Sequence, residues 1–433
     1  MSQFQASSAA AAWQPESIFA WQALPLRFGV GATREIGFEA MRLDMKRVLI
    51  VTDGNLVATG LPDRVSGLLR AEGMDVTVWS GSHTEPTEES LRRGLSELAD
   101  LGADSYVGVG GGSCIDTAKF LNLYQSHPAE ISTYLAKPHG DGQRIPGPLR
   151  PMIGLPTTSG TGSECTPMAL LGIGASHVKA AVSDERLRPR VAIIDPLNVI
   201  SAPPEVTASA GYDALVQALE SFTSLPYDRR PAAAAPQDRP VYTGPNPLSD
   251  VWSERAISLG GRFLRRAVFN GDDLEARTGM ALAALFSRLG NSGVHLPHAI
   301  GYAVANLAKD YRPAGYLVDE PLVPHGFSVI VAAPESFAFS YPAAPQRHGE
   351  AARLLGIDGD DEPSRAITEW LHRLVRDTDG PAGLDAVGFT EADIPELAAS
   401  AITQQRILAC SPRRVTVEDL AGVMRSSFTK SRV

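Results

Sequence analysis

Residues 47–196 alternate between short apolar runs and longer amphipathic stretches, and this alternation is the feature that most constrains the fold. The apolar runs are RVLIV, DVTVW, SYVGVG, PMIGLP and VAII, and each is expected to be a strand. Helical stretches separate them, such as EESLRRGLSELADLG at 88–102. Strands that alternate with helices form a parallel sheet with helices on both faces. The pattern therefore predicts an N-terminal α/β domain with a doubly wound, Rossmann-like parallel sheet.

The pattern changes near residue 200, where the apolar spacing becomes helical and strand signals almost disappear. A chain of 433 residues is long enough for two or three domains. We expect a loose tail and lead-in over 1–24, the α/β domain over 25–200 and an all-α domain over 201–433. The proline-containing stretch 225–250 is interpreted as a surface excursion or an arm for contacts in an oligomer.

The composition argues against several classes of partner. The formal net charge is −10 and no basic cluster is present, so neither nucleic acid nor an anionic membrane is expected to bind. No apolar run approaches the roughly 20 residues of a membrane-spanning helix. The three cysteines are far apart and form no CxxC pair, which favours a reducing compartment. Because the N-terminus lacks a basic, leucine-rich leader, the expected location is the cytoplasm.

The loop GVGGGS follows a predicted strand and opens a predicted helix. Its glycines, Gly110, Gly111 and Gly112, let a phosphate approach the backbone, and the free N–H groups of the next helix attract anions. Ser113 stands where the GxGxxG pattern has its last glycine. A tight turn without any ligand explains this loop equally well.

A second polar loop, PTTSGTGSE, follows the next strand and carries Thr157, Thr158 and Thr161. Hydroxyl groups and backbone amides together suit a phosphate or a ribose, although a polar capping loop has the same composition. Two such loops at neighbouring strand ends favour a bound ligand over either loop taken alone.

Asp53 ends the first strong strand, where an acidic side chain can bind the hydroxyls of an adenosine ribose. It precedes the glycine loop and does not follow it, so the order differs from the usual Rossmann pattern. A simple turn aspartate in TDGN is the competing explanation.

The stretch GYDALVQALES, at 211–221, places the carboxylate of Asp213 and the amide of Gln217 four residues apart. On a helix these side chains share one face, one turn from each other. Histidines follow in GVHLPHAIGY and LVPHGFS. The combination raises the hypothesis of a metal site with an unusual amide member.

The segments VTDGN, GVGGGSCIDTAK, PTTSGTGSE, IIDP, GYDALVQALES and VPHG resemble, in this order, the iron-type (group III) alcohol dehydrogenases. Within that family the chain is most similar to the hydroxyacid-oxoacid transhydrogenases, through ALESFTSLPYDRRP, GPNPLSD, NSGVHLPH and DEPLVPHGFSV. The resemblance implies a homo-oligomer, often a homodimer, with a cleft between its two domains. It also implies metal-assisted hydride transfer between NAD and a small alcohol, aldehyde, hydroxy acid or oxo acid, such as 4-hydroxybutyrate and 2-oxoglutarate.

The resemblance assigns cofactor contacts residue by residue. Asp53 is implied to meet the adenosine ribose, and the glycine loop to wrap the pyrophosphate. The complete set implied for NAD is Asp53, Gly110, Gly111, Gly112, Ser113, Asp116, Thr157, Thr158, Thr161 and Lys179.

The metal ligands implied by the resemblance are Asp213, Gln217, His298 and His325, of which Asp213, His298 and His325 are also the implied catalytic residues. Iron is the first expectation and zinc the alternative. The chain departs from the family at Gln217, where the family has a histidine. The amide is expected to ligate through its oxygen, to hold a water nearby, or to mark a site that has lost its metal and relies on the histidines as proton donors.

Two other positions lie near the implied metal ligands in the sequence but are not expected to bind the metal. Tyr302 stands where the family has another histidine, and His295 is expected near the site but not as a ligand. Lys309 and Arg312 are candidates to hold a substrate carboxylate, with solvated surface charges as the alternative.

Three other functions remain open at this point. They are an ordinary NAD(H)-dependent alcohol or aldehyde dehydrogenase, a metal-independent reductase of the maleylacetate type, and a catalytically inactive relative that serves as a binding module.

Overall fold

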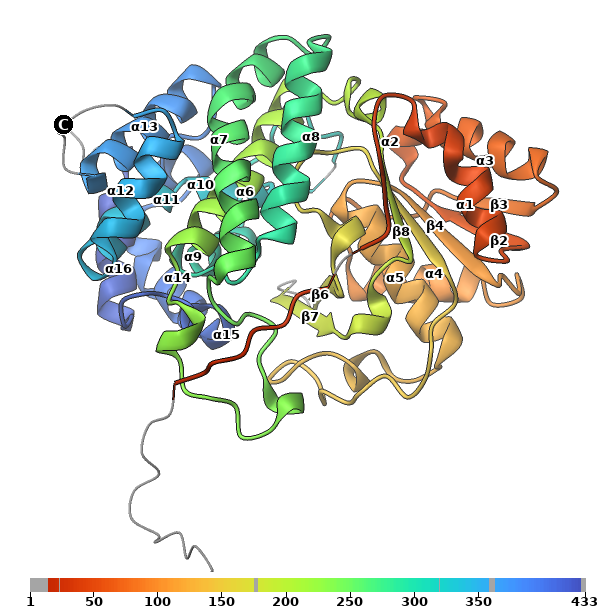
Figure 1. Ribbon diagram of the computed structural model, residues 1–433, viewed down its shortest axis with the longest axis horizontal. Helices are drawn as coiled ribbons and strands as arrows, with labels where there is room; N and C mark the ends of the chain where they lie inside the picture. Colours follow the sequence, from red (N-terminus) through yellow and green to blue (C-terminus); the bar gives the residue numbers. More distant parts are fainter. Residues whose placement is uncertain (1–14, 23, 175–177, 319, 358–362, 430–433) are drawn as a thin grey trace, which may run out of the picture.

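The computed structural model describes residues 15–22, 24–174, 178–318, 320–357 and 363–429. An α/β half, coloured red to yellow, lies beside a half built of helices, coloured green to blue (Figure 1). The fold class predicted from the sequence is confirmed. None of the described helices is long and apolar enough to cross a membrane.

A six-stranded sheet forms the centre of the α/β half, and all its strand pairs are parallel. In spatial order its strands are β1 (Leu26–Phe28), β8 (Val191–Ile194), β5 (Met152–Pro156), β4 (Ser105–Gly110), β2 (Arg47–Val51) and β3 (Asp75–Trp79). The chain runs outward from β2 to β3 and then crosses back to β4, so the strand order reverses between β2 and β4. Ligands of such sheets bind beyond the carboxyl ends of the strands at this reversal.

Alternate residues of each central strand face opposite layers of helices. Val48 and Ile50 of β2 pack on one side, and Leu49 and Val51 pack on the other. The helices of the α/β half are α1 (Ile36–Arg42), α2 (Gly54–Val57), α3 (Leu61–Ala71), α4 (Glu88–Glu97) and α5 (Gly112–Ser126). Because both faces are buried, the strands are continuous apolar runs, which is why the sequence predicted them.

An antiparallel hairpin of β6 (Met168–Ile173) and β7 (Val178–Ser183) interrupts the alternation between β5 and β8. This hairpin was not predicted from the sequence. Its strand MALLGI has no polar alternation, and its inner residues Ala169 and Leu171 join the core beneath α5. Short apolar runs of this kind do not distinguish a strand from a helical segment.

The second half contains helices around one large apolar core. They are α6 (Pro204–Thr223), α7 (Pro247–Phe269), α8 (Leu274–Leu289), α9 (Leu296–Asn306), α10 (His325–Ile330), α11 (Ala333–Ser340), α12 (Pro345–Leu354), α13 (Pro363–Asp377), α14 (Ile394–Ala401), α15 (Gln405–Leu408) and α16 (Val417–Ser426). Helix α6 is buried on all sides over most of its length. A helix buried all round lies at the centre of its domain, so the polar side chains of α6 are held in the interior.

The stretch expected as an excursion runs as an insert over residues 225–246, before α7 begins. The N-terminal arm, residues 15–22, lies along this insert (Figure 1). The backbone N–H of Glu16 donates to the Arg230 carbonyl at 2.8 Å, and the Glu16 carboxylate pairs with Arg239 at 3.1 Å. Trp21 stacks on Trp252 of α7 with ring centroids 6.4 Å apart. Residues 1–14 of the expected tail lie outside the described residues.

Candidate active site

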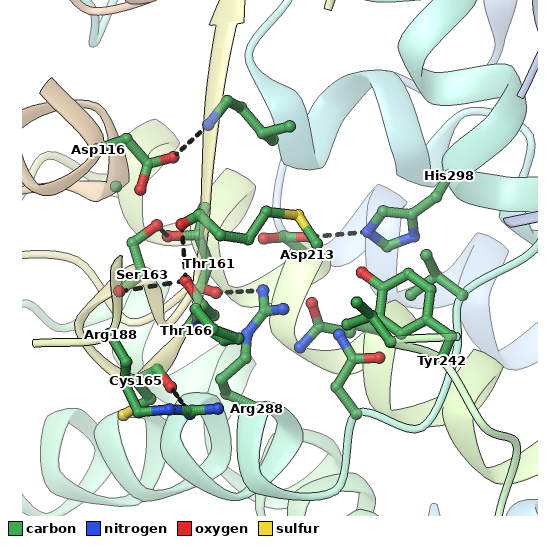
Figure 2. A pocket seen from close by; sticks show the side chains of 18 of the residues that line it. Asp116, Thr161, Ser163, Cys165, Thr166, Arg188, Asp213, Tyr242, Arg288 and His298 are labelled. Carbon is green, nitrogen blue, oxygen red and sulfur yellow. Dashed lines mark hydrogen bonds and ion pairs between the residues drawn. The ribbon is translucent and has the colours of Figure 1, made fainter. Parts of the chain in front are cut away.

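A cavity of about 710 Å³ lies between the two halves. One wall comes from the start of α5, the loop after β5 and the β6–β7 hairpin, and the opposite wall comes from α6, α8, α9 and α10. Figure 2 shows Thr161 and Ser163 on one side and His298 on the other. Of the residues predicted from the sequence, the cavity collects Gly112, Ser113, Asp116, Thr161, Lys179, Asp213, Gln217, His298 and His325. The structure therefore brings both predicted groups, the cofactor loops and the metal ligands, to a single space.

The two polar loops lie against each other because β4 and β5 pair in register, with Gly110 opposite Pro156. Thr157 N–H donates to the Gly110 carbonyl at 3.0 Å. A Cβ on Gly112 would lie 2.5 Å from the Thr161 hydroxyl, so a larger residue there would force the Thr161 side chain to shift. The N-terminus of α5 thus opens directly onto the cavity, as a phosphate-binding turn requires.

Four of the predicted cofactor residues do not line the cavity within the described part of the chain. Gly110, Gly111, Thr157 and Thr158 belong to the two loops but are not among the lining residues, and the Thr158 side chain is 3.6 Å from a Cβ placed on Gly111.

Asp53 also lies outside the cavity lining and caps the short helix α2. Its Oδ1 accepts hydrogen bonds from Asn55 N at 2.8 Å and Leu56 N at 3.0 Å. Its Oδ2 faces the Cys114 thiol, 3.3 Å away. Asp53 therefore has the turn role that was the competing explanation for it. A contact with a ribose would use its Oδ2.

Asp116 and Lys119 stabilise the wall of the cavity that carries the predicted cofactor loops. Lys119 was not predicted from the sequence. Lys119 is fully buried, and its Nζ donates to the Ser163 carbonyl at 2.7 Å, the Thr166 hydroxyl at 2.9 Å and the Met168 carbonyl at 2.7 Å. The Asp116 carboxylate lies 3.3 Å from the same Nζ. Burial lowers the pKa of Lys119. Its position three residues after Asp116 was the available signal, because that spacing places both on one helix face.

Lys179 reaches the cavity from β7 and forms an ion pair with Glu85. Burial lowers the pKa of Lys179 to about 8. Lys309, in contrast, pairs with Asp393 at 2.7 Å, and neither it nor Arg312 is among the described residues that line the cavity.

Asp213, His298 and His325 converge on the helical wall, with one possible ligand atom from each lying within 4.8 Å of the others. His298 Nε2 is 3.3 Å and His325 Nε2 is 3.5 Å from Asp213 Oδ1. Neither contact has hydrogen-bonding geometry, and Oδ1 is buried without a partner. Ligands about 2.1 Å from a tetrahedral ion lie about 3.4 Å from one another. This spacing and the unsatisfied oxygen fit a divalent cation held by the three side chains.

Glu220 completes this arrangement and was missed by the sequence analysis. It is fully buried on α6, seven residues after Asp213, and its Oε2 accepts a hydrogen bond from His298 Nδ1. Its Oε1 accepts from His295 N at 2.7 Å. A carboxylate on the far nitrogen of a metal-binding histidine fixes the tautomer and turns the near nitrogen toward the metal. The signal was present as the spacing of 213, 217 and 220 on one helix face.

The charges at this cluster attract a cation. Burial disfavours the charged form of Asp213, but His325 and His298 outweigh it and lower its pKa to about 2. Burial opposes the charged form of His298 as well, yet Glu220 and Asp213 raise its pKa to about 10. Burial lowers the pKa of His325 to about 4. Two buried carboxylates therefore attract one positive charge, which either a proton on His298 or a divalent cation supplies.

Gln217 lies one turn from Asp213 and faces the same cavity. Its Nε2 donates to the Ser287 hydroxyl of α8 at 2.8 Å. This bond commits the nitrogen and leaves the amide oxygen as the atom available to a cation or a water.

Tyr302 and His295 border the cluster in different ways. The Tyr302 ring stacks on His325, with centroids 5.6 Å apart and planes at 14°, so it packs where the family has a histidine. His295 is fully buried, lies edge-on to Phe337 and does not line the cavity. Burial lowers its pKa to about 4, which keeps the imidazole neutral.

Comparison with known proteins accounts for this architecture. Residues 25–196 match the iron-containing alcohol dehydrogenase family, and residues 241–428 match the C-terminal domain of Fe-containing alcohol dehydrogenases. The mitochondrial hydroxyacid-oxoacid transhydrogenase of Bos taurus is 39% identical over 412 residues, covering 93% of this chain and 88% of that protein.

Solved structures agree with this result. A 1,3-propanediol oxidoreductase superposes with a TM-score of 0.81 and 27% identity, over 96% of this chain and 99% of its own. A sulfoacetaldehyde reductase from Bifidobacterium kashiwanohense, solved in complex with NAD+, superposes with a TM-score of 0.78 and 25% identity, over 95% and 99% of the two chains.

The cytoplasmic location expected from the sequence is contradicted by these comparisons. The related transhydrogenases of Bos taurus, Pongo abelii and Homo sapiens are named as mitochondrial, which points to the mitochondrion. The expectation rested on the absence of a secretory leader, which does not address import into an organelle. With the fold and both family regions matched, the chain belongs to the iron-containing alcohol dehydrogenase family and is an oxidoreductase.

Proposed function

We propose that this protein is a hydroxyacid-oxoacid transhydrogenase, which passes hydride between a small hydroxy acid and an oxo acid through a retained NAD. The observation that carries this proposal is the single cavity that joins the glycine-loop wall to the Asp213, His298 and His325 cluster. The related transhydrogenases support the choice within the family.

NAD is the proposed cofactor, and it supplies the hydride-carrying nicotinamide. The N-terminus of α5 at Gly112 and Ser113 receives the pyrophosphate, and Thr161 and Lys179 line the path toward the helical wall. Asp116 acts indirectly: it pairs with the buried Lys119, and Lys119 holds the loop at Ser163 and Thr166 through hydrogen bonds. Asp53, Gly110, Gly111, Thr157 and Thr158 complete the proposed NAD contacts from the loops that follow β2, β4 and β5.

The proposed metal is iron, with zinc as the alternative, and it supplies Lewis-acid polarisation of the substrate oxygen. Asp213, His298 and His325 are the proposed ligands, with the Gln217 oxygen as a weak fourth. Glu220 holds the proton on His298 Nδ1 and so leaves Nε2 free for coordination. An amide oxygen binds such a cation less strongly than an imidazole nitrogen does, so we expect Gln217 to weaken the site.

Retention of NAD is favoured by the cover over the cavity. Ala20, Trp21 and Gln22 of the N-terminal arm line it, together with residues 236 and 239–243 of the insert. Trp21 Nε1 donates to the Leu289 carbonyl at 3.2 Å, which ties the arm to the end of α8. A cover that must move before the cofactor leaves slows release and suits a transhydrogenase.

The test is a reaction without added nucleotide. Purified protein, passed through gel filtration, is given 4-hydroxybutyrate and 2-oxoglutarate, and both products are followed by mass spectrometry. Sustained turnover with a nucleotide absorbance on the protein supports the proposal. Turnover that requires added NAD in stoichiometric amounts indicates an ordinary dehydrogenase instead.

A metal-independent reductase is the second candidate, favoured by the amide at position 217. In that case His298, with its raised pKa, donates a hydrogen bond from Nε2–H to the substrate oxygen. Turnover that survives exhaustive chelation would support this candidate and contradict the metal-assisted one.

We also propose the division into domains at residues 25–200 and 201–433, preceded by a lead-in over 1–24, and a homodimer in solution. Light scattering on the purified protein tests the dimer, and a monomeric mass would contradict it.

A further inference from the structure

We propose that Arg288 and Asn291 form a carboxylate-binding subsite beside the Asp213, His298 and His325 cluster, which holds an acidic end of the hydroxy-acid or oxo-acid substrate. This inference rests on the proposed function and adds the residues that recognise the acid. Both side chains line the cavity where α8 ends and the chain turns into α9.

Two contacts fix the direction of the Arg288 side chain: the packing of its aliphatic part and a hydrogen bond from one guanidinium nitrogen. Its Cβ and Cγ pack over Gly162, where an added Cβ would lie 2.9 Å from Arg288 Cβ. Its Nη2 donates to the Thr161 carbonyl. Figure 2 shows the guanidinium between Thr161 and Asp213. The side chain is thereby aimed across the cavity, from the helical wall toward the cofactor loops.

Two nitrogens of Arg288 remain without acceptors. Nε is buried with no hydrogen-bond partner, and Nη1 forms no hydrogen bond within the described residues. A partly desolvated guanidinium is stabilised most by a carboxylate that accepts two parallel hydrogen bonds from it. A buried donor without an acceptor costs free energy until a ligand supplies one.

The other cationic side chains of the cavity wall already have carboxylate partners. Lys179 pairs with Glu85, Arg188 with Glu185 at 3.0 Å and Arg239 with Glu16 at 3.1 Å. Among the described residues, no carboxylate lies within ion-pair distance of Arg288. Arg288 is therefore a cation of the cavity lining that lacks an ion-pair partner among the described residues, and an anionic ligand can supply one.

Asn291 provides a second donor three residues along the chain. Its Oδ1 accepts a hydrogen bond from the Ser221 hydroxyl at 3.3 Å, and its Nδ2 is buried without a partner. Ser221 belongs to α6, the helix that carries Asp213 and Gln217. The bond from Ser221 therefore leaves the amide N–H groups of Asn291 as donors next to the metal-ligand cluster.

The position favours a substrate carboxylate over a cofactor phosphate. The pyrophosphate turn at Gly112 and Ser113 has its own free N–H groups at the start of α5. Arg288 lies close enough to the Asp213, His298 and His325 cluster to help lower the pKa of Asp213 and of His325. A substrate whose reacting carbon lies at that cluster would bring its acidic end to Arg288, whereas a neutral alcohol would leave both donors unpaired.

The experiment compares an acid with its neutral counterpart. KM is measured for succinate semialdehyde and for butanal with NADH, in wild type, Arg288→Gln and Asn291→Asp, and the dissociation constant of NADH is measured by fluorescence. Loss of charge-assisted hydrogen bonds is expected to raise the acid-to-neutral KM ratio on the order of 10- to 100-fold in both variants. Asn291→Asp keeps an acceptor for Ser221 and leaves the Thr161 contact intact, so it serves if Arg288→Gln misfolds.

Two control variants separate this effect from general charge. Arg188→Gln removes a charge from the lining of the same cavity, but from a side chain already paired with Glu185. Lys309→Ala removes a charge outside the cavity. Both are expected to leave the ratio within about twofold. An unchanged ratio in Arg288→Gln and Asn291→Asp overturns the subsite, and a parallel loss of NADH affinity reassigns it to a cofactor phosphate.

Calorimetric binding of succinate distinguishes this inference from the proposed function. If wild type turns over no hydroxy acid, the proposed function fails, yet succinate still binds wild type and binds Arg288→Gln at least tenfold more weakly. Equal binding to both proteins overturns the subsite, whatever the turnover.

Discussion

Glu220 contributes no atom to the cavity, yet it determines how His298 presents its nitrogen to a metal. Its carboxylate accepts from His298 Nδ1 and from two backbone N–H groups at the start of α9. Replacing a carboxylate of this kind typically costs 10- to 100-fold in metal affinity. We expect about that loss in Glu220→Gln, measured by competition with a chromophoric chelator.

A matched control exists in the α/β half. Glu39 is equally buried and pairs with Arg27 and Arg42, far from the cluster. Glu39→Gln is expected to lower the unfolding temperature without changing metal affinity. Equal metal affinity in Glu220→Gln and wild type would show that the hydrogen bond to His298 does not support coordination.

Gln217→His restores the imidazole that the family has at this position. The variant loses the bond from Gln217 Nε2 to Ser287, worth about 1 kcal/mol, and gains a stronger ligand for a borderline cation. We expect metal affinity to rise on the order of tenfold, read as bound iron and zinc per chain. Full and equal occupancy in both proteins would refute the claim that the amide weakens the site.

At the residue scale, the sequence predicted the side chains whose chemistry is unusual in a helix and missed those that become unusual only through burial. Asp213 and Gln217 stood out by their spacing, and the histidines by their motifs. Glu220 and Lys119 are ordinary helical residues until tertiary packing removes their solvent. No periodicity in the sequence reports that loss of solvent.

At the scale of elements, the arm and the insert act as one cover over the cavity. Trp21 stacks on Trp252, bonds to the Leu289 carbonyl and lines the cavity. In Trp21→Ala the cover loses its largest apolar contact, so we expect the release of NADH to speed up at least tenfold, measured by stopped-flow displacement. Ile18 is 56% exposed on the same arm, and Ile18→Ala should release NADH as wild type does. Equal release rates in all three proteins would exclude a role for the arm in retention.

The strands predicted from the sequence are those that form continuous apolar runs. The runs that became β2, β4, β5 and β8 are largely apolar and buried on both faces. The hairpin of β6 and β7 lacked such a signal, and β1 spans only Leu26–Phe28. The pairing of the arm with the insert joins residues far apart in the sequence, and local patterns carry no information about such contacts.

For the whole molecule, the three proposed ligands come from separate helices, so a bound metal links α6, α9 and α10 in one core. A ligand that binds only the folded state stabilises it by about 2.7 kcal/mol at a concentration 100 times its dissociation constant. We therefore expect exhaustive chelation to lower the unfolding temperature by several degrees, and added Fe2+ or Zn2+ to restore it. In Asp213→Asn one ligand is lost, and chelation should shift its unfolding temperature much less. A wild-type unfolding temperature that is the same with chelator and with added metal would mean that the cluster does not bind these cations, and the metal-independent mechanism through His298 would then take its place.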